Sequence, residues 1–380
     1  ISQAYGKKDY HLVNRGFFVA SVLSLIVGAM ISIVGSLAIR DFLILMHTPG
    51  EILEQSLDYI KVILLGFVIT VLNNLFMSVL QSLGDSSTPF WALLVSSVTN
   101  IGLDCVFVLT LKWGVQGAAA ATVLSQVFSF AICAAGLKRL KFVSILDGSK
   151  SKNARLTVRM LKTGLPVGIM SMVTAVGGMI LQFFVNDLGA SAVAAYAAST
   201  KIRSVIGEFS NALGMTFMTF VGQNYGAQKY DRIKAGVRMG VLLSILIHIP
   251  LSAVEIFGGK RIASLMVTDP PVLELCRQYL LIVGIFVFFL GFLMVFRNCI
   301  QGMGNTWIPM LSGGLEVFSR LIFGYWLGRH SFMGIAAAEA SAWISVSIML
   351  GSSFFILFRK VLRTQTPENT TDTKNIRTDS

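Results

Sequence analysis

Long apolar stretches recur along the whole chain and are separated by short polar segments. A helix of about 20 apolar residues crosses about 30 Å of hydrocarbon. Strands of a membrane barrel would instead be about ten residues long and would alternate polar with apolar positions. The pattern therefore predicts an all-α polytopic membrane protein with about ten crossings. The predicted spans are 17–39, 59–80, 90–111, 115–136, 163–185, 193–220, 237–257, 279–300, 308–327 and 334–357.

The composition agrees with this class and excludes several others. Of the 380 residues, 54% are hydrophobic and 13% are charged, whereas a soluble domain carries about 25% charged residues. The four cysteines show no metal or disulfide spacing and are interpreted as small buried apolar residues. The four histidines form no cluster, and no GxxxxGK[ST] phosphate loop occurs. We therefore expect neither an enzyme nor a bound cofactor.

The basic residues are distributed unevenly between the predicted loops. The net charge is +12, and Lys and Arg number 20 on one side of the membrane against 7 on the other. Such an excess marks the cytoplasmic side, which places both ends of this chain in the cytoplasm. The basicity is thus explained by topology and by contact with anionic lipid, and no nucleic-acid partner is expected.

An internal repeat relates the two parts of the chain. A shift of 220 residues keeps the alignment in register without a gap. Repeat symmetry of this kind implies an architecture and restricts where a transport site can lie. The aligned pairs include Gln3 with Gln223, Tyr5 with Tyr225, Gly6 with Gly226, Pro89 with Pro309 and Gly114 with Gly334.

One repeat contains about six spans, an even number, so both copies cross the membrane in the same direction as parallel repeats. The spans 163–185 and 193–220 have no partner in the first copy. We therefore expect about 60 residues with two helices to be missing from the front, and about twelve helices in the whole protein. The predicted organisation is 1–137 for the first copy without its first two helices, 138–162 for a cytoplasmic connector, 163–358 for the second copy and 359–380 for a disordered cytoplasmic tail.

Three polar residues inside predicted spans are candidates for an ion site. Asn100 and Asp104 are four residues apart, so they share one face of a helix. Asp104 lies nine residues before Trp113 and Thr122 nine residues after it, which puts both about 13 Å from the turn between the two helices. A carboxylate, an amide and a hydroxyl at one depth suit either a proton or Na⁺. The alternative is that Asp104 is paired with Asn100 or with the backbone and only fixes helix packing.

The second copy differs from the first at these positions. The shift of 220 converts Asn100, Asp104 and Thr122 into Arg320, Gly324 and Ala342. The second copy thus lacks the carboxylate, and we place ion coupling in the first copy.

Other polar residues in the spans have two interpretations each. Glu316 and Arg320 have the spacing of an i, i+4 ion pair, and we favour a structural role for them. Asn73 and Asn74 either line a cavity or hydrogen-bond a neighbouring helix. Arg203 and Glu208 are further candidates to line a cavity, although such side chains also reach the membrane surface by snorkelling.

Several segments together carry a resemblance to a known family. They are Ser-Gln-Ala-Tyr-Gly at 2–6, Leu-Gly-Asp-Ser-Ser-Thr-Pro at 83–89, Asn-Ile-Gly-Leu-Asp at 100–104, Gly-Val-Gln-Gly-Ala-Ala-Ala-Ala-Thr at 114–122, Gly-Leu-Pro at 164–166, Ala-Ala-Tyr at 194–196 and Val-Gly-Gln-Asn-Tyr-Gly-Ala at 221–227. In this order and spacing they resemble the multidrug and toxic compound extrusion (MATE) family over nearly the whole chain.

The resemblance implies two six-helix lobes around a central cleft, with alternating access driven by Na⁺ or H⁺ and export of organic cations. In prokaryotic members the N-lobe cation site uses residues that match Asn100, Asp104 and Thr122, together with an Asp on a first helix that this chain lacks. Some members instead carry a Glu in the seventh helix. Residues 168–176 contain no acid here, which favours the N-lobe site. The expected protein is a monomeric, cation-coupled drug antiporter of a bacterial plasma membrane.

Two other functions remain open at this point. A flippase for lipid-linked precursors would hold phosphates with basic residues inside the membrane, and the candidates for that role are Lys201, Arg203, Arg297 and Arg320. A channel or a membrane scaffold is the third alternative. Oxygen ligands from Asp, Asn and Thr suit Na⁺ and H⁺ alike, so both ions remain candidates.

Overall fold

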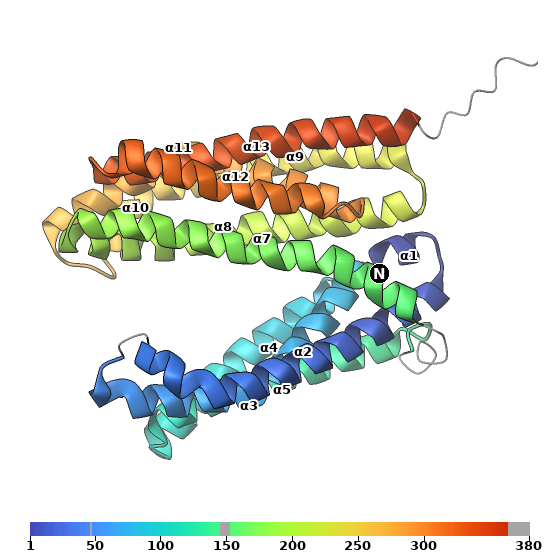
Figure 1. The fold of residues 1–380 in the computed structure, drawn as a ribbon, viewed down its shortest axis with the longest axis horizontal. Helices are drawn as coiled ribbons and strands as arrows, with labels where there is room; N and C mark the ends of the chain where they lie inside the picture. Colours follow the sequence, from blue (N-terminus) through green and yellow to red (C-terminus); the bar gives the residue numbers. More distant parts are fainter. Residues whose placement is uncertain (46–47, 145–152, 364–380) are drawn as a thin grey trace, which may run out of the picture. The chain divides into compact units, whose positions relative to one another are not determined.

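The structure is a computed structural model that describes residues 1–45, 48–144 and 153–363. These residues form helices and no strands, so the prediction of an all-α polytopic membrane protein is confirmed over the described part of the chain (Figure 1). The helices are α1 (Ser2–Gly6), α2 (Tyr10–Leu45), α3 (Gly50–Ser82), α4 (Ser87–Asp104), η1 (Cys105–Thr110), α5 (Gly114–Arg139), α7 (Ala154–Asp187), α8 (Ala190–Gly226), α9 (Tyr230–Ala253), η2 (Val254–Gly258), α10 (Gly259–Ala263), α11 (Pro270–Gly302), α12 (Trp307–Phe323), η3 (Gly324–Gly328) and α13 (Phe332–Arg363), where η marks a π-helix.

Eight of the described helical segments are long and apolar enough to cross a membrane, against about ten predicted spans. The two spans that are not among the eight lie in α8 and in α12 with η3. Their apolar character is diluted by ionisable side chains, Arg203 and Glu208 in α8 and Glu316 and Arg320 in α12. These two spans of unit 2 therefore each carry ionisable side chains.

The chain divides into two compact units, residues 1–161 and 162–380. The predicted connector, 138–162, is shortened by helix at both ends, because α5 continues to Arg139 and α7 begins at Ala154; its centre, 145–152, lies outside the described residues. The predicted tail begins too early. Helix α13 continues to Arg363, and the basic side chains of its last turn stabilise this end of the helix through the helix dipole. Residues 364–380 lie outside the described part of the chain.

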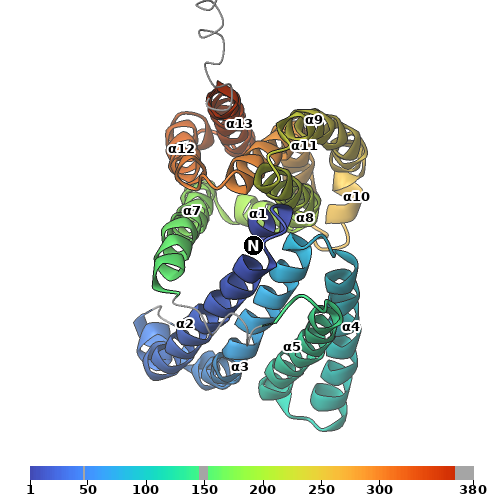
Figure 2. The same ribbon diagram turned by 90° about the vertical axis from the view of Figure 1, so that its right-hand side faces the viewer.

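Unit 1 is built around α3 and α5, which pack against each other, with α2 on α3 and α4 on α5 (Figure 2). Its apolar core includes an aromatic row, in which Phe76 makes edge contacts with Phe17 and Phe130 at ring centroid distances of 5.2 Å and 4.8 Å. At Gly66 the two central helices approach closely. A Cβ there would lie 2.3 Å from Cγ2 of Val123, so only glycine allows this packing.

Unit 2 is built around α11, which packs against α8, α9 and α13, while α12 packs against α13 (Figures 1 and 2). Its core is larger than that of unit 1 and contains Tyr279 on α11 and Trp343 and Phe354 on α13, each at most 2% exposed. An α-helix that is apolar on all sides is suited to such a central position. The unit therefore surrounds α11, whose buried residues are mainly apolar and include Arg297, with helices that also carry charge.

The repeat extends to the backbone. In unit 1 the π-helix η1 begins after Asp104, and in unit 2 the π-helix η3 begins at Gly324, which is position 104 after the shift of 220 (324 − 220). Single π-helical turns are rare in proteins and occur frequently at functional sites. The two units thus share an irregular backbone at the position where only unit 1 has a carboxylate.

The close approach at Gly66 generates a prediction. In the substitution Gly66→Ala, the new methyl overlaps the stiff Val123 side chain, so α3 and α5 must separate. We expect a loss of about 1–3 kcal/mol of stability, seen as a lower melting temperature of the full-length protein in detergent. Gly102→Ala is the matched control, because no atom lies within 4 Å of a Cβ at that exposed helical position. Equal melting temperatures for the two variants would contradict the packing argument.

Candidate functional site

Asn100 and Asp104 lie on the last two turns of α4, and both side chains are half-buried. The atoms Nδ2 of Asn100 and Oδ1 of Asp104 are buried and have no hydrogen-bond partner among the described residues. A buried polar atom without a partner costs about 1–3 kcal/mol, and more when it is charged. The two residues therefore do not form the closed structural pair that was the alternative for Asp104.

Thr122 lies on α5, the helix that packs against α4. Its hydroxyl donates a hydrogen bond of 3.0 Å to the carbonyl oxygen of Ala118 on its own helix, so its lone pairs stay available to a ligand. The hydroxyl of Ser96 on α4 donates to the carbonyl of Ser125 on α5 at 3.0 Å. This bond fixes the register of the two helices. It lies one turn from Asn100 on α4 and one turn from Thr122 on α5.

Counting along the antiparallel helices from that bond places Thr122 close to the level of Asn100, about one helical turn from Asp104. The sequence predicts Thr122 at the level of Asp104, because each is nine residues from Trp113. The difference has a structural reason. The segment after Asp104 is the π-helix η1, which packs more residues into each turn than the α-helix on the other side.

Asn73 is a polar residue of unit 1 on a third helix, α3. It is 3% exposed, and its Nδ2 donates a hydrogen bond of 2.7 Å from α3 to Oε1 of Gln126, one turn after Thr122 on α5. Its Oδ1 is buried and has no partner in the described part of the chain. Asn73 thus bonds a neighbouring helix and keeps one acceptor free, whereas the side chain of Asn74 is exposed.

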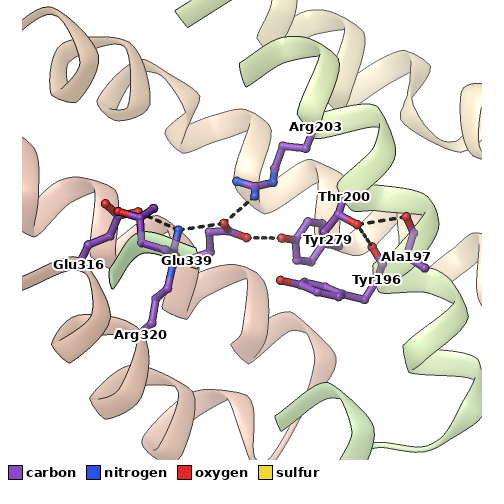
Figure 3. A network of polar contacts seen from close by, with 9 residues as sticks. Tyr196, Ala197, Thr200, Arg203, Tyr279, Glu316, Arg320 and Glu339 are labelled. Carbon is purple, nitrogen blue, oxygen red and sulfur yellow. Dashed lines mark hydrogen bonds and ion pairs between the residues drawn. The ribbon is translucent and has the colours of Figure 1, made fainter. Parts of the chain in front are cut away.

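In unit 2, Glu339 of α13 is the centre of a buried charged network (Figure 3). Its Oε1 lies 2.7 Å from Nη2 of Arg203 and 3.5 Å from Nη2 of Arg320. Its Oε2 accepts a hydrogen bond from the hydroxyl of Tyr279. The guanidinium carbon of Arg203 lies 5.1 Å from the centroid of the Trp343 ring. One carboxylate therefore joins α8, α11, α12 and α13.

Glu316 is the second carboxylate of this charged network. Its Oε1 lies 2.9 Å from Nη2 of Arg320, at the i, i+4 spacing, and its Oε2 lies 3.0 Å from Nη2 of Arg297 on α11. Arg320 is thus shared between Glu316 and Glu339. Removing one partner from a buried ion pair costs about 3–5 kcal/mol, because the other charge stays buried without compensation.

Only part of this network can be predicted from the sequence. The spacing of Glu316 and Arg320 within one helix is visible in the sequence, whereas the contacts of Arg203 with Glu339 and of Arg297 with Glu316 join separate helices. The available signal was the presence of ionisable residues in apolar spans. The structure assigns Arg203 to the charged network, and the side chains of Lys201 and Glu208 are exposed.

Comparison with known proteins gives the family. The MatE family model matches residues 1–106 and 166–326. The chain is 27% identical over 358 residues to "Probable multidrug resistance protein YoeA" of Bacillus subtilis, a match that covers 88% of this chain and 77% of that protein. It is 26% identical over 298 residues to "FAD transporter" of Shewanella oneidensis, which covers 74% and 64% of the two chains.

Solved structures show the same fold. The structure described as "Crystal structure of MATE in the bent conformation" matches with a TM-score of 0.88 and 22% identity, over 96% of this chain and 82% of that one. The "Outward-facing conformation of a multidrug resistance MATE family transporter of the MOP superfamily" matches with the same score and identity, over 95% and 82%. The chain, with the motifs, the repeat and the helical units described above, belongs to the MatE family of membrane transporters.

Proposed function

We propose that the protein exports small organic compounds from a bacterial cell in exchange for Na⁺ or H⁺, which binds in unit 1 at Asp104. Support comes from two sources. Relatives bear the names of multidrug resistance and multidrug export proteins. The observation that carries the site is the pair of buried atoms without partners, Oδ1 of Asp104 and Nδ2 of Asn100.

The chemistry of these residues fits a monovalent cation. The carboxylate of Asp104 supplies a negative charge and hard oxygen atoms, and neither oxygen is held in an ion pair within the described residues. The Asn100 amide supplies one oxygen and a donor for a water bound to the cation, and Thr122 supplies a hydroxyl oxygen. The free Oδ1 of Asn73 is a further acceptor one helix away.

A cation at Asp104 would couple to transport by neutralising a charge inside the membrane. A carboxylate without a compensating charge inside the membrane costs free energy. Binding of Na⁺ or H⁺ therefore stabilises the conformation in which the ion is bound at Asp104. A cationic compound in the same protein competes for that negative charge. Exchange of the two cations between opposite sides of the membrane then follows from mutual exclusion.

The remaining expectations belong to the same proposal. The substrates are small organic cations, the protein acts as a monomer surrounded by lipid in the plasma membrane, and both ends of this chain lie in the cytoplasm. The excess of Lys and Arg on one side of the predicted topology supports that orientation.

The structure argues against phosphate binding by the basic residues, which the flippase alternative needs. Three of the four candidates, Arg203, Arg297 and Arg320, already pair with glutamates of the charged network. A phosphate would have to displace these carboxylates. Drug export is therefore preferred, and a failure of efflux together with rescue of cell-envelope synthesis would instead support the flippase.

The substitution Asp104→Asn tests the cation site. Loss of the charge should weaken binding of the coupling ion about 10- to 100-fold, as expected for about 1.5–3 kcal/mol per bond to a charged group. The measurement is efflux of a fluorescent organic cation from vesicles that contain the full-length protein, with Na⁺ and pH gradients imposed separately. The exposed Asp41 on α2 gives the matched control Asp41→Asn. Efflux by Asp104→Asn at the wild-type rate would exclude the site.

The hydroxyl of Thr122 is tested by a pair of substitutions. Thr122→Ala removes an oxygen ligand and should raise the concentration of coupling ion needed for half-maximal efflux about 2- to 10-fold, in line with about 0.5–1.5 kcal/mol for a neutral polar contact. Thr122→Ser keeps the hydroxyl and should stay close to the wild type. The same half-maximal concentration in all three proteins would remove Thr122 from the site.

A further inference from the structure

A second carboxyl group without a partner is buried in unit 2, outside the charged network and far along the chain from Asp104. Glu255 lies in the π-helix η2, directly after α9, and is 1% exposed. Both of its carboxyl oxygens are buried and have no hydrogen-bond partner among the described residues. Neither the cation site nor the ion pairs of Glu316 and Glu339 use this group.

Glu255 packs closely against α11 at Gly284. A Cβ at Gly284 would lie 3.0 Å from Cβ and 3.5 Å from Oε2 of Glu255, so glycine leaves room for the carboxyl group. The nearest hydroxyl along the chain is that of Ser252. It donates a hydrogen bond of 2.7 Å to the carbonyl oxygen of Gly284 and is not available to Glu255. The carboxyl group is thus closely packed, and in this conformation no described residue donates a hydrogen bond to it.

The charged groups that act on Glu255 come from two neighbouring helices. They are Arg203 of α8 and Glu339 of α13. From α11, the titratable group at this part of the unit is Tyr279, whose hydroxyl is bound to Glu339. On α9, His248 lies two turns earlier and hydrogen-bonds Ser210 at 2.8 Å.

Residues from α10 contribute little to this environment. The side chain of Lys260 is 52% exposed and lies 3.5 Å from Glu274, which is itself exposed. The field at Glu255 is therefore set by the charged network, not by the solvent-facing charges near the end of α10.

The charges of the network do not balance without Glu255. Three arginines, Arg203, Arg297 and Arg320, face two glutamates, Glu316 and Glu339, which leaves one positive charge in excess. An ionised Glu255 would cancel that excess. A buried carboxylate without donors, however, costs free energy that protonation removes. The excess positive charge of the network favours an ionised Glu255, whereas burial without donors favours a protonated one. Protonation of Glu255 is therefore linked to the charge balance of the network.

Arg203 has one hydrogen-bond donor that the described contacts leave unused. Its Nε is buried and has no hydrogen-bond partner among the described residues, while its Nη2 holds Glu339. Arg203 can therefore donate to a second carboxylate without releasing the first. Its side chain is 20% exposed, against 6% for Arg297 and 7% for Arg320, so it is the most exposed arginine of the network.

The repeat shows that this arrangement is particular to unit 2. The shift of 220 converts Glu255 into Gly35, in a regular part of α2 (255 − 220). Conversely, Asp104 of unit 1 corresponds to Gly324. Among the described residues, each unit thus contains one carboxyl group with a buried oxygen that has no hydrogen-bond partner, Asp104 in unit 1 and Glu255 in unit 2. The two positions are not equivalent in the repeat, and each adjoins or lies in a π-helix.

We propose that Glu255 is a proton-binding site of unit 2, which binds a proton in one state of the transport cycle and, on releasing it, accepts a hydrogen bond from Nε of Arg203. The proton is exchanged with water, and no other bond forms or breaks. The place of this step in a cycle rests on the proposed function, whereas the proton site itself can be measured without transport.

Infrared spectroscopy of the full-length protein in lipid measures the site directly. Lowering the pH from about 9 to about 5 should produce the carbonyl band of a buried protonated carboxyl group, because buried glutamates titrate within this range. The band should be absent in Glu255→Gln and present in the control Glu274→Gln, which changes an exposed carboxylate of the same unit. A band that persists in Glu255→Gln, or no such band in the wild type, would overturn the proposal.

A labelling experiment keeps the test valid if Glu255→Gln fails to fold. Glutamate labelled with ¹³C at the side-chain carboxyl shifts the band in the wild-type protein only if the titrating group is a glutamate. A band that does not shift would also overturn the proposal. Glu316 and Glu339 are each held by two arginines, whereas neither carboxyl oxygen of Glu255 has a hydrogen-bond partner among the described residues.

Efflux measurements separate this proposal from the cation site. Gln resembles protonated Glu, so Glu255→Gln should hold the efflux rate near its low-pH value across the range and still respond to Asp104→Asn. Asp104→Asn alone should abolish ion-driven efflux and keep the infrared band of Glu255. If Asp104→Asn has no effect while the band behaves as expected, the proposed function fails and the proton site stands. An unchanged pH profile in Glu255→Gln would exclude its part in the cycle.

Discussion

The constraint on which the structure depends is that an ionisable group inside hydrocarbon must find a partner of opposite charge or lose its own charge. The two units meet this constraint differently. Unit 2 surrounds two carboxylates with three arginines and a tyrosine, so its charges form a connected network. Unit 1 leaves Oδ1 of Asp104 buried without a hydrogen-bond partner among the described residues, one helical turn from Asn100 on α4. This difference from unit 2 is the reason why the proposed function places the cation in unit 1.

The same backbone plan therefore supports two kinds of interior. Both units pack their helices around central elements, and both break the α-helix at matching positions with η1 and η3. At the position of Asn100, unit 2 has Arg320, a cation that is covalently attached and held by Glu316 and Glu339. Unit 2 thus carries permanently the kind of charge that unit 1 takes up from solution in the proposed function.

Much of this organisation could be predicted from the sequence, because it depends on local periodicity and on the repeat. The helices, the parallel copies and the shared face of Asn100 and Asp104 follow from spacing along one chain. Contacts between separate helices do not, and so Glu339 and Arg297 were not recognised as members of one network. The level of Thr122 was shifted by the π-helix η1, whose extra residue leaves no mark in hydropathy. Glu255 was overlooked for a related reason, since only the fold shows that its neighbours offer no donor.

The ion pair between Arg203 and Glu339 also has a consequence for biosynthesis. Glu339 is made 136 residues after Arg203 (339 − 203), which at about 5–20 residues per second corresponds to about 7–27 s. During that interval α8 must hold an arginine whose carboxylate partner does not yet exist, whereas Glu316 and Arg320 of α12 can neutralise each other as soon as their helix forms. The ion pair of Arg203 with Glu339 can form only when α13 has been made, so the order of synthesis makes α13 the step that completes the charged network.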